Sequence, residues 1–239
     1  MKRCLFFDFV KRLFDIVASG CAILAFLPFG LLIALGIKLS SPGPVFYRTV
    51  RVGRNRREFS MFKFRSMHVF QPEDPQSGKK SEGGFIANGN RIFRLGGFLR
   101  KSKLDELPQL LNVFLGQMSV VGPRPITAKT ADRYVGDYRQ ILDVRPGLSC
   151  LDSLFDYTHG ELFVKNDEVY KAEVLPVRLE LAKIYVERRC LWLDLYCIVR
   201  TVLLIFEIAF LQKRTFPYTD YEQEARGKVL ALDKVQIGG

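Results

Sequence analysis

The residues best suited to chemistry are two adjacent carboxylates, Asp105 and Glu106, which stand between a basic run and a Val-Gly-Pro-Arg-Pro turn. Ser102 and Pro108 are typical of a helix start, which places both carboxylates at the positive end of a helix dipole. A carboxylate there can serve as a nucleophile or a metal ligand. Both are also ordinary first-turn residues, and spacing alone favours that plainer interpretation. One apolar face of the predicted helix consists of Leu104, Leu107, Leu111, Phe114 and Met118.

Basic residues surround the carboxylates in the sequence. Arg91 and Arg94 are three apart on a predicted helical stretch that leads through Arg100, so Arg91 and Arg94 share a face suited to a phosphate. Upstream, alternating residues on both sides of a Gly53-Arg54-Asn55 turn predict a β-hairpin. Most of its basic residues fit a solvated face or one against anionic lipid. They are Arg48, Arg51, Arg54, Arg56, Arg57, Lys63 and Arg65.

An apolar segment precedes this hairpin. Residues 16–37 carry no charge, and a straight helix of that length would reach ~33 Å, enough to cross a bilayer. Pro28 lies near the middle and predicts a break that leaves two arms too short to span. Basic residues flank both ends, and such flanks prefer the same side of a membrane. The pattern therefore favours a re-entrant hairpin broken at Pro28 over a spanning helix.

The overall composition fits a folded protein with anionic partners. Of the 239 residues, 48% are apolar, and the net charge of +11 suits phosphate head groups, nucleotides or nucleic acid. Charge alone does not choose among these partners. The five cysteines lack paired spacing, which argues against a disulfide framework or a zinc site. The sequence holds no dinucleotide-binding or P-loop motif.

Two further segments bear on the site and on the membrane. Residues 71–90 are polar and rich in Gly, Pro and Ser, which predicts a loop beside the carboxylates, either a lid or slack chain. The apolar run 191–211 contains Asp194, Arg200 and Glu207. These charges make burial across a bilayer costly, so the run fits a helix in the membrane interface or a core helix.

A resemblance changes the interpretation of the carboxylates. The run L-D-E-L-P-Q-L-L-N-V-x-x-G-x-M-S-V-V-G-P-R-P, residues 104–125, resembles the signature of the bacterial sugar transferases, the monotopic polyprenol-phosphate phosphoglycosyl transferases. The chain departs from the family after Gly147, where a glycine and then a Trp or Ala next to Gln are usual and residues 149–152 read Ser-Cys-Leu-Asp. Further matches, in the family's order, are Lys11-Arg12-Leu13-Phe14-Asp15, Ser41-Pro42-Gly43-Pro44-Val45-Phe46, Lys63-Phe64-Arg65-Ser66-Met67 and Arg145-Pro146-Gly147.

The resemblance implies an α/β fold, mostly helical with a small β-hairpin or sheet, in a monotopic membrane enzyme. We expect a re-entrant N-terminal helical hairpin at residues 1–39, a catalytic domain with interfacial helices at 40–211 and a polar C-terminal tail at 212–239. Among family members, the chain resembles the minimal catalytic unit. The expected place is the cytoplasmic face of the bacterial inner membrane, in contact with membrane lipids, and no nucleic acid partner is expected.

The implied reaction moves a phosphosugar from a UDP-sugar to polyprenol phosphate, releases UMP and forms a polyprenol diphosphate sugar, the first membrane step of a surface glycan or glycoprotein pathway. Asp105 would form a phospho-aspartate in a ping-pong route, while Glu106 would help to hold Mg2+ or manage a proton. Both carboxylates are the expected metal ligands, and Pro123 and Pro125 would fix Arg124. The phosphate-binding cations implied are Arg100 first, then Lys63, Arg65, Arg91, Arg94, Arg124 and Arg145.

Two alternatives remain open at this point. One is a non-enzymatic membrane-surface protein that binds anionic lipid or nucleic acid through the basic hairpin. The other is an inactive member of the same family, motivated by the departure at Cys150-Leu151-Asp152.

Overall fold

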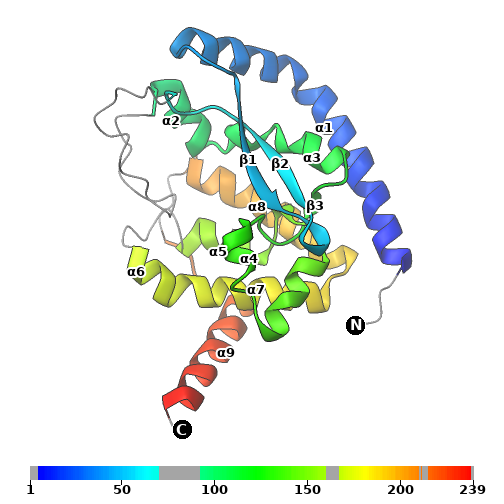
Figure 1. Ribbon diagram of the computed structural model, residues 1–239, viewed down its shortest axis with the longest axis vertical. Helices are drawn as coiled ribbons and strands as arrows, with labels where there is room; N and C mark the ends of the chain where they lie inside the picture. Colours follow the sequence, from blue (N-terminus) through cyan, green and yellow to red (C-terminus); the bar gives the residue numbers. More distant parts are fainter. Residues whose placement is uncertain (1–4, 70–91, 160–166, 210, 212–214, 238–239) are drawn as a thin grey trace.

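A long N-terminal helix lies along one side of the protein. The computed structural model describes residues 5–69, 92–159, 167–209, 211 and 215–237. Its first element is the 36-residue helix α1 (Leu5–Ser40), and the other elements lie to one side of it (Figure 1). Pro28 is inside α1, whose ribbon bends without reversing (Figure 1). The re-entrant hairpin is therefore not confirmed, because the missing N–H of one proline can be tolerated as a bend within a single helix.

Both ends of α1 pack against the same body. Near the start, Asp15 accepts hydrogen bonds from Ser119 Oγ at 3.0 Å and from the Val120 N–H at 2.9 Å. Near the end, Ile37 is fully buried in a cluster with Phe64, Phe93 and Leu99. Several apolar side chains between these two contacts are exposed, among them Leu24, Leu27, Phe29, Leu31, Leu32 and Leu35. Helix α1 thus covers the body with one side and exposes an apolar side.

The predicted β-hairpin is confirmed. Strand β1 (Phe46–Val52) pairs antiparallel with β2 (Glu58–Phe64). The turn between them is a short 3-10 helix in which Asn55 has a φ of 55°. Directly paired residues of antiparallel strands point to the same face of a sheet. The pairings Tyr47↔Lys63 and Arg51↔Phe59 therefore place the side chains of Arg51 and Lys63 on one face of the hairpin.

The segment that carries the carboxylates is broken where a continuous helix was predicted. Helix α2 (Arg94–Lys101), a 3-10 turn (Leu104–Glu106) and helix α3 (Gln109–Phe114) follow one another. Lys103 separates the first two with a left-handed φ of 58°. Leu107 and Pro108 separate the 3-10 turn from α3, whose buried residues are Gln109, Asn112 and Val113. Leu111 and Phe114, assigned to the apolar face, are exposed.

A second small sheet follows. Strand β3 (Ser119–Val121) pairs in parallel with β4 (Gly147–Ser149). Gly122, directly after β3, meets Gly147 of β4 backbone to backbone, since a Cβ added to Gly147 would lie 2.1 Å from the Gly122 nitrogen. Glycine is required here because no side chain fits between the two chains. The Val-Gly-Pro-Arg-Pro and Arg-Pro-Gly motifs are thus held against each other. The elements between the strands are α4 (Ala128–Ala131) and a 3-10 helix (Gly136–Asp143).

A layer of helices packs under the sheets and contains the main core. Helix α7 packs against both α5 and α9. Leu154, Leu181, Ile184 and Cys197 are among the buried residues of this core. The helices of the layer are α5 (Leu151–His159), α6 (Asp167–Val169) with a π-turn (Tyr170–Val174), α7 (Leu175–Arg188), α8 (Leu191–Ala209) and α9 (Asp220–Ile237).

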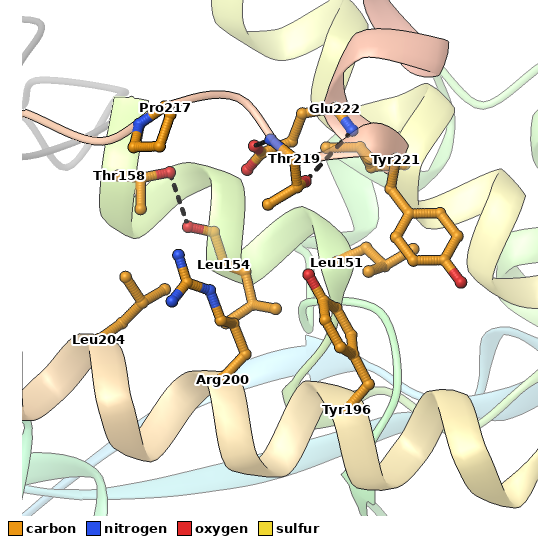
Figure 2. Close-up of a pocket in the computed structure, with 11 residues that line it drawn as sticks. Leu151, Leu154, Thr158, Tyr196, Arg200, Leu204, Pro217, Thr219, Tyr221 and Glu222 are labelled. Carbon is orange, nitrogen blue, oxygen red and sulfur yellow. Dashed lines mark hydrogen bonds between the residues drawn. The ribbon is translucent and has the colours of Figure 1, made fainter.

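The C-terminal segment, predicted only as a polar tail, contains α9. Thr219 and Glu222 form a capping box at its start: the Thr219 N–H donates to Glu222 Oε2 at 2.6 Å and the Glu222 N–H to Thr219 Oγ1 at 3.4 Å (Figure 2). Thr219 and Glu222 also line a pocket, and Tyr196 and Arg200 of α8 extend toward it (Figure 2). Helix α9 therefore belongs to the folded body.

Helix α8 combines the two interpretations that its sequence left open. One side packs into the core through Leu193, Cys197 and Leu204. The other side is apolar and exposed, with Trp192 80% exposed. The further exposed apolar residues of this helix are Leu191, Leu195, Val199, Val202, Leu203 and Phe206.

Candidate active site

Asp105 and Glu106 are held in different environments by the 3-10 turn that carries them. Asp105 is only 8% exposed, and its Oδ1 is buried without a hydrogen-bond donor from the described residues. Glu106 Oε1 accepts a hydrogen bond from Lys63 Nζ at 2.8 Å. One carboxylate is therefore paired, while the other keeps an oxygen available for a reaction.

These environments separate the pKa values of the two carboxylates. Burial, and then the negative charge of Glu106, raise the pKa of Asp105 above its ordinary value of 3.8, against the opposing effect of Lys63, Lys103 and Arg100. Burial alone would also raise the pKa of Glu106, but nearby cations, Lys63 foremost, lower it to about 2. Glu106 is thus ionised at neutral pH.

Asn112 positions Lys63 by joining α3 to the edge of β2. Its side chain is fully buried. Asn112 Oδ1 accepts from the Phe62 N–H at 3.1 Å, and Nδ2 donates to the Ser60 carbonyl at 2.8 Å and to Gln117 Oε1 at 2.7 Å. The side chain thereby takes the place of a neighbouring strand next to Lys63. These hydrogen bonds require both the oxygen and the nitrogen of an amide, which accounts for the asparagine in the 104–125 motif.

Arg124 is fixed by backbone and side-chain contacts from three directions. The buried Pro123 before it accepts a hydrogen bond from the Gly147 N–H at 2.9 Å. The Arg124 N–H donates to Asp152 Oδ2 at 3.1 Å, and Arg124 Nη1 lies 3.2 Å from Asp156 Oδ2. Arg124 also helps to lower the pKa of Glu106, after burial and the two lysines. It therefore links the carboxylate turn to α5.

Asp152 and Asp156 belong to a buried cluster that the sequence analysis missed. Both lie on α5, where residues 151–158 are all buried. Arg178 Nη atoms approach Asp152 at 4.0 Å and Asp156 at 3.7 Å, and the Tyr170 hydroxyl donates to Asp156 Oδ1 at 3.0 Å. Two aspartates four residues apart in a largely apolar segment are the sequence signal that could have revealed this cluster. Its second cation, besides Arg178, is Arg124.

The remaining predicted cations lie at varying distances from the carboxylates. Arg100 is exposed and close enough to lower the pKa of Asp105. Arg94 is exposed at the start of α2, and no contact found in the described residues joins it to Asp105. Arg91 and the predicted loop at 71–90 lie outside the described residues. Lys103, absent from the predicted site, acts on both carboxylates and places Nζ 4.6 Å from the Tyr157 ring centre.

Arg65 and Arg145 instead have structural contacts. Arg65 is 5% exposed and donates to the Ser41, Pro42 and Pro44 carbonyls and to Ser41 Oγ. These bonds use most of its donors to hold the turn after α1, which leaves little for a phosphate. Arg145 Nε donates to the Gly116 carbonyl at 2.9 Å. The geometry does not bring these two side chains to the carboxylates.

The carboxylates can be tested as ligands for the expected Mg2+. Among the residues described, no group of three or more His, Cys, Asp or Glu side chains gathers at one point. Mg2+ commonly binds one or two carboxylates together with water and substrate phosphates. The unpartnered Oδ1 of Asp105 beside the ionised Glu106 fits that donor set.

The fold and the site together define a small α/β protein in which an acidic pair lies among cations beside an apolar helix. The chain belongs to the bacterial sugar transferase family, whose model matches residues 6–208. This match confirms the family resemblance of the sequence.

Named relatives come from several bacteria. The chain is 38% identical over 199 residues to the UDP-glucose:undecaprenyl-phosphate glucose-1-phosphate transferase of Xanthomonas campestris pv. campestris, a match that covers 82% of this chain and 38% of that protein. It is 36% identical to a protein of the same name from Caulobacter vibrioides, over 82% of this chain and 69% of that one. A UDP-N-acetylgalactosamine-undecaprenyl-phosphate N-acetylgalactosaminephosphotransferase of Aeromonas hydrophila is 35% identical, with 82% and 43% covered. The chain thus spans less than half the length of two of these relatives.

Proposed function

We propose that this protein is a phosphoglycosyl transferase that moves a phosphosugar from a UDP-sugar to polyprenol phosphate at a bacterial membrane. The observation that carries the proposal is the buried Oδ1 of Asp105, which has no hydrogen-bond partner among the described residues, next to the paired Glu106. The names of the relatives, which specify UDP-sugars and undecaprenyl phosphate, support the donor and the acceptor. The product, a polyprenol diphosphate sugar, would begin the membrane stage of a surface glycan or glycoprotein pathway.

The proposed route has two displacements at one phosphorus. Asp105 forms a bond from a carboxylate oxygen to the sugar-bearing phosphorus, and the bond from that phosphorus to the UMP phosphate oxygen breaks, which releases UMP. An oxygen of polyprenol phosphate then attacks the same phosphorus and displaces Asp105. The route divides one encounter between anions into two steps on a covalent intermediate.

The cations of the site reduce the repulsion between Asp105 and an anionic donor. Burial raises the pKa of Asp105, and Lys63, Lys103 and Arg100 oppose this rise, so these cations favour the ionised, nucleophilic form of Asp105. Arg124, fixed to α5, supplies a guanidinium suited to phosphate oxygens. Asp105 and Glu106 would hold Mg2+, which would neutralise phosphate charge.

The outward apolar surfaces support a monotopic arrangement on the cytoplasmic face of the inner membrane. Within the described residues, the stretch Phe6–Ser40 is a helix long and apolar enough to cross a membrane. However, Asp15 and Ile37, near its two ends, both contact the same body. A straight crossing would separate those ends by the bilayer, so we infer that α1 enters the membrane from one side. The exposed apolar side of α8 would lie in the interface.

UMP release tests the proposal. Detergent-solubilised protein is given polyprenol phosphate, Mg2+ and a panel of UDP-sugars, and wild type is compared with Asp105→Asn, Glu106→Gln and the control Asp132→Asn, an exposed acid paired with Arg56. We expect release with at least one sugar, a loss of about 1,000-fold or more in Asp105→Asn, and wild-type rates in the control. No release from folded wild type with any sugar would contradict the proposal.

The covalent step has its own test. Without polyprenol phosphate, wild type should release about one UMP per active site and stop, because the phospho-aspartate persists until an acceptor arrives. Asp105→Asn should show no such burst. Release that requires the acceptor from the first turnover would replace the ping-pong route with a direct transfer.

A further inference from the structure

Arg51 lies at the end of β1, beside the segment that carries Arg124. The Val52 N–H donates to the Ile126 carbonyl at 2.8 Å, and these two residues form an isolated β-bridge. The bridge joins the end of β1 to the residue that follows the Pro-Arg-Pro segment. Arg51 and Arg124 are therefore brought together from parts of the chain more than 70 residues apart.

The Arg51 guanidinium has no counterion among the residues that the structure describes. Its side chain is partly buried, and Nε is buried without a hydrogen-bond acceptor. Across the described residues, no hydrogen bond or ion pair of the Arg51 side chain is found. Burial, and then the positive charge of Arg124, lower the pKa of Arg51. A partly desolvated cation next to another cation is unfavourable unless an anion joins them.

The neighbouring cluster does not supply this anion, because its carboxylates already have cations. Asp152 and Asp156 face Arg178 and Arg124, so two negative groups meet two positive ones. The positive charge of Arg51 remains in excess at the edge of this cluster. The arrangement is that of a site completed by a bound anion.

Arg51 also faces the same way as the reactive turn. It shares a face of the hairpin with Lys63, which pairs with Glu106. Lys63 lies opposite Tyr47, four residues from Arg51, which corresponds to about 13 Å along the strand. This backbone separation leaves room for two phosphate groups, one beside Lys63 and one beside Arg51.

We propose that Arg51 and Arg124 form a second phosphate subsite, which binds a phosphate group other than the one attacked by Asp105. The inference rests on the proposed function only for the source of that phosphate, which is the leaving nucleotide or the polyprenol phosphate. Fork-shaped guanidinium groups suit this ligand because each can bind two phosphate oxygens.

Arg51→Gln tests the subsite, with Arg48→Gln as its matched control. Arg48 lies on the opposite face of β1, exposed above the Phe62 ring, and its loss changes the net charge equally. UMP and UDP are titrated calorimetrically into the full chain in detergent, and the KM for polyprenol phosphate is measured separately. For a nucleotide phosphate, we expect UDP affinity to fall about 10- to 100-fold in Arg51→Gln and to stay within about twofold in Arg48→Gln.

The two measurements distinguish the sources. Weaker nucleotide binding assigns the subsite to the nucleotide phosphate, whereas a raised KM for polyprenol phosphate with unchanged nucleotide affinity assigns it to the lipid. Unchanged values in both measurements would overturn the proposal. If Arg51→Gln does not fold, Arg51→Lys takes its place, and we expect a smaller loss of affinity because an ammonium group cannot bind in the same forked manner.

The outcome is independent of the proposed reaction. Wild type that binds UDP through Arg51 but releases no UMP would refute the transferase activity and leave the subsite in place. Wild type that releases UMP, with an Arg51→Gln variant that binds both substrates normally, would refute the subsite alone.

Discussion

Replacing Lys63 with methionine should show how much the ion pair between Lys63 and Glu106 contributes to the free energy of unfolding. Lys63 Nζ lies 2.8 Å from Glu106 Oε1, and the two side chains are 23% and 21% exposed. Burial opposes ionisation, yet the cations lower the pKa of Glu106 from 4.5 to about 2. At about 1.4 kcal/mol per pH unit, this net difference corresponds to about 3 kcal/mol, which remains after the attraction of Lys63, Lys103 and Arg124 has offset the cost of burial. Allowing for partial screening by solvent, we expect Lys63→Met to lower the free energy of unfolding by about 1 to 2 kcal/mol at pH 7.

The pH dependence gives this prediction its sign. A carboxylate whose pKa is lower in the folded state stabilises the fold above its unfolded pKa, and the contribution disappears as the pH falls toward the folded value. The difference between wild type and Lys63→Met should therefore be greatest at neutral pH and shrink between pH 4.5 and about 2. Thermal unfolding of detergent-solubilised protein at pH 7 and at about pH 3, inside this range, measures it, with the exposed Lys101→Met as control. Equal stability of both variants at pH 7 would refute the reasoning.

Three other predictions follow from the site and its supports. Since burial and Glu106 raise the pKa of Asp105 above 3.8, turnover should fall as the pH drops through that raised value. The residual activity of Glu106→Gln should persist to lower pH, because this variant lacks the negative charge beside Asp105. Identical pH profiles of kcat/KM for wild type and Glu106→Gln would contradict this prediction. Gly147→Ala should destabilise the fold by about 3 kcal/mol, because its Cβ would meet the amide nitrogen of the facing glycine at 2.1 Å; Gly227→Ala, with open space around it, should be neutral or stabilising in the same thermal unfolding assay. Asp156→Asn removes the carboxylate charge that lies 3.2 Å from the Arg124 guanidinium, so UDP affinity measured by calorimetry should fall about 10-fold. Unchanged affinity would show that Asp156 does not position Arg124.

Local patterns predicted the hairpin correctly and the carboxylate segment only in part. Strand alternation and the Gly53-Arg54-Asn55 turn act between near neighbours, so they identified β1 and β2 without knowledge of the fold. The periodicity from Leu104 to Met118 indicated one helix, but the segment divides into the 3-10 turn and α3, and α3 turns a different side inward. Side-chain spacing predicts a face only while the helix remains continuous.

The site shows a similar division. The family motif led to Asp105, Glu106 and Arg124, which the structure brings together through Lys63 and α5. The family motif favoured Arg65 over Arg51 as a phosphate ligand, although both are arginines of one basic hairpin. In the structure, Arg65 donates its hydrogen bonds to the turn after α1, whereas Arg51, beside Arg124, has no counterion among the described residues.

Motifs and local periodicity identified the family, the position of the carboxylate pair, the hairpin and the long apolar N-terminal segment, because these are properties of neighbouring residues. The folded structure was needed to show which carboxylate is paired and which arginines have structural contacts. It also showed that α1 contacts one body at both Asp15 and Ile37. Burial and charge pairing depend on residues far apart in the chain, and these long-range contacts set the pKa values and the free donors of the site.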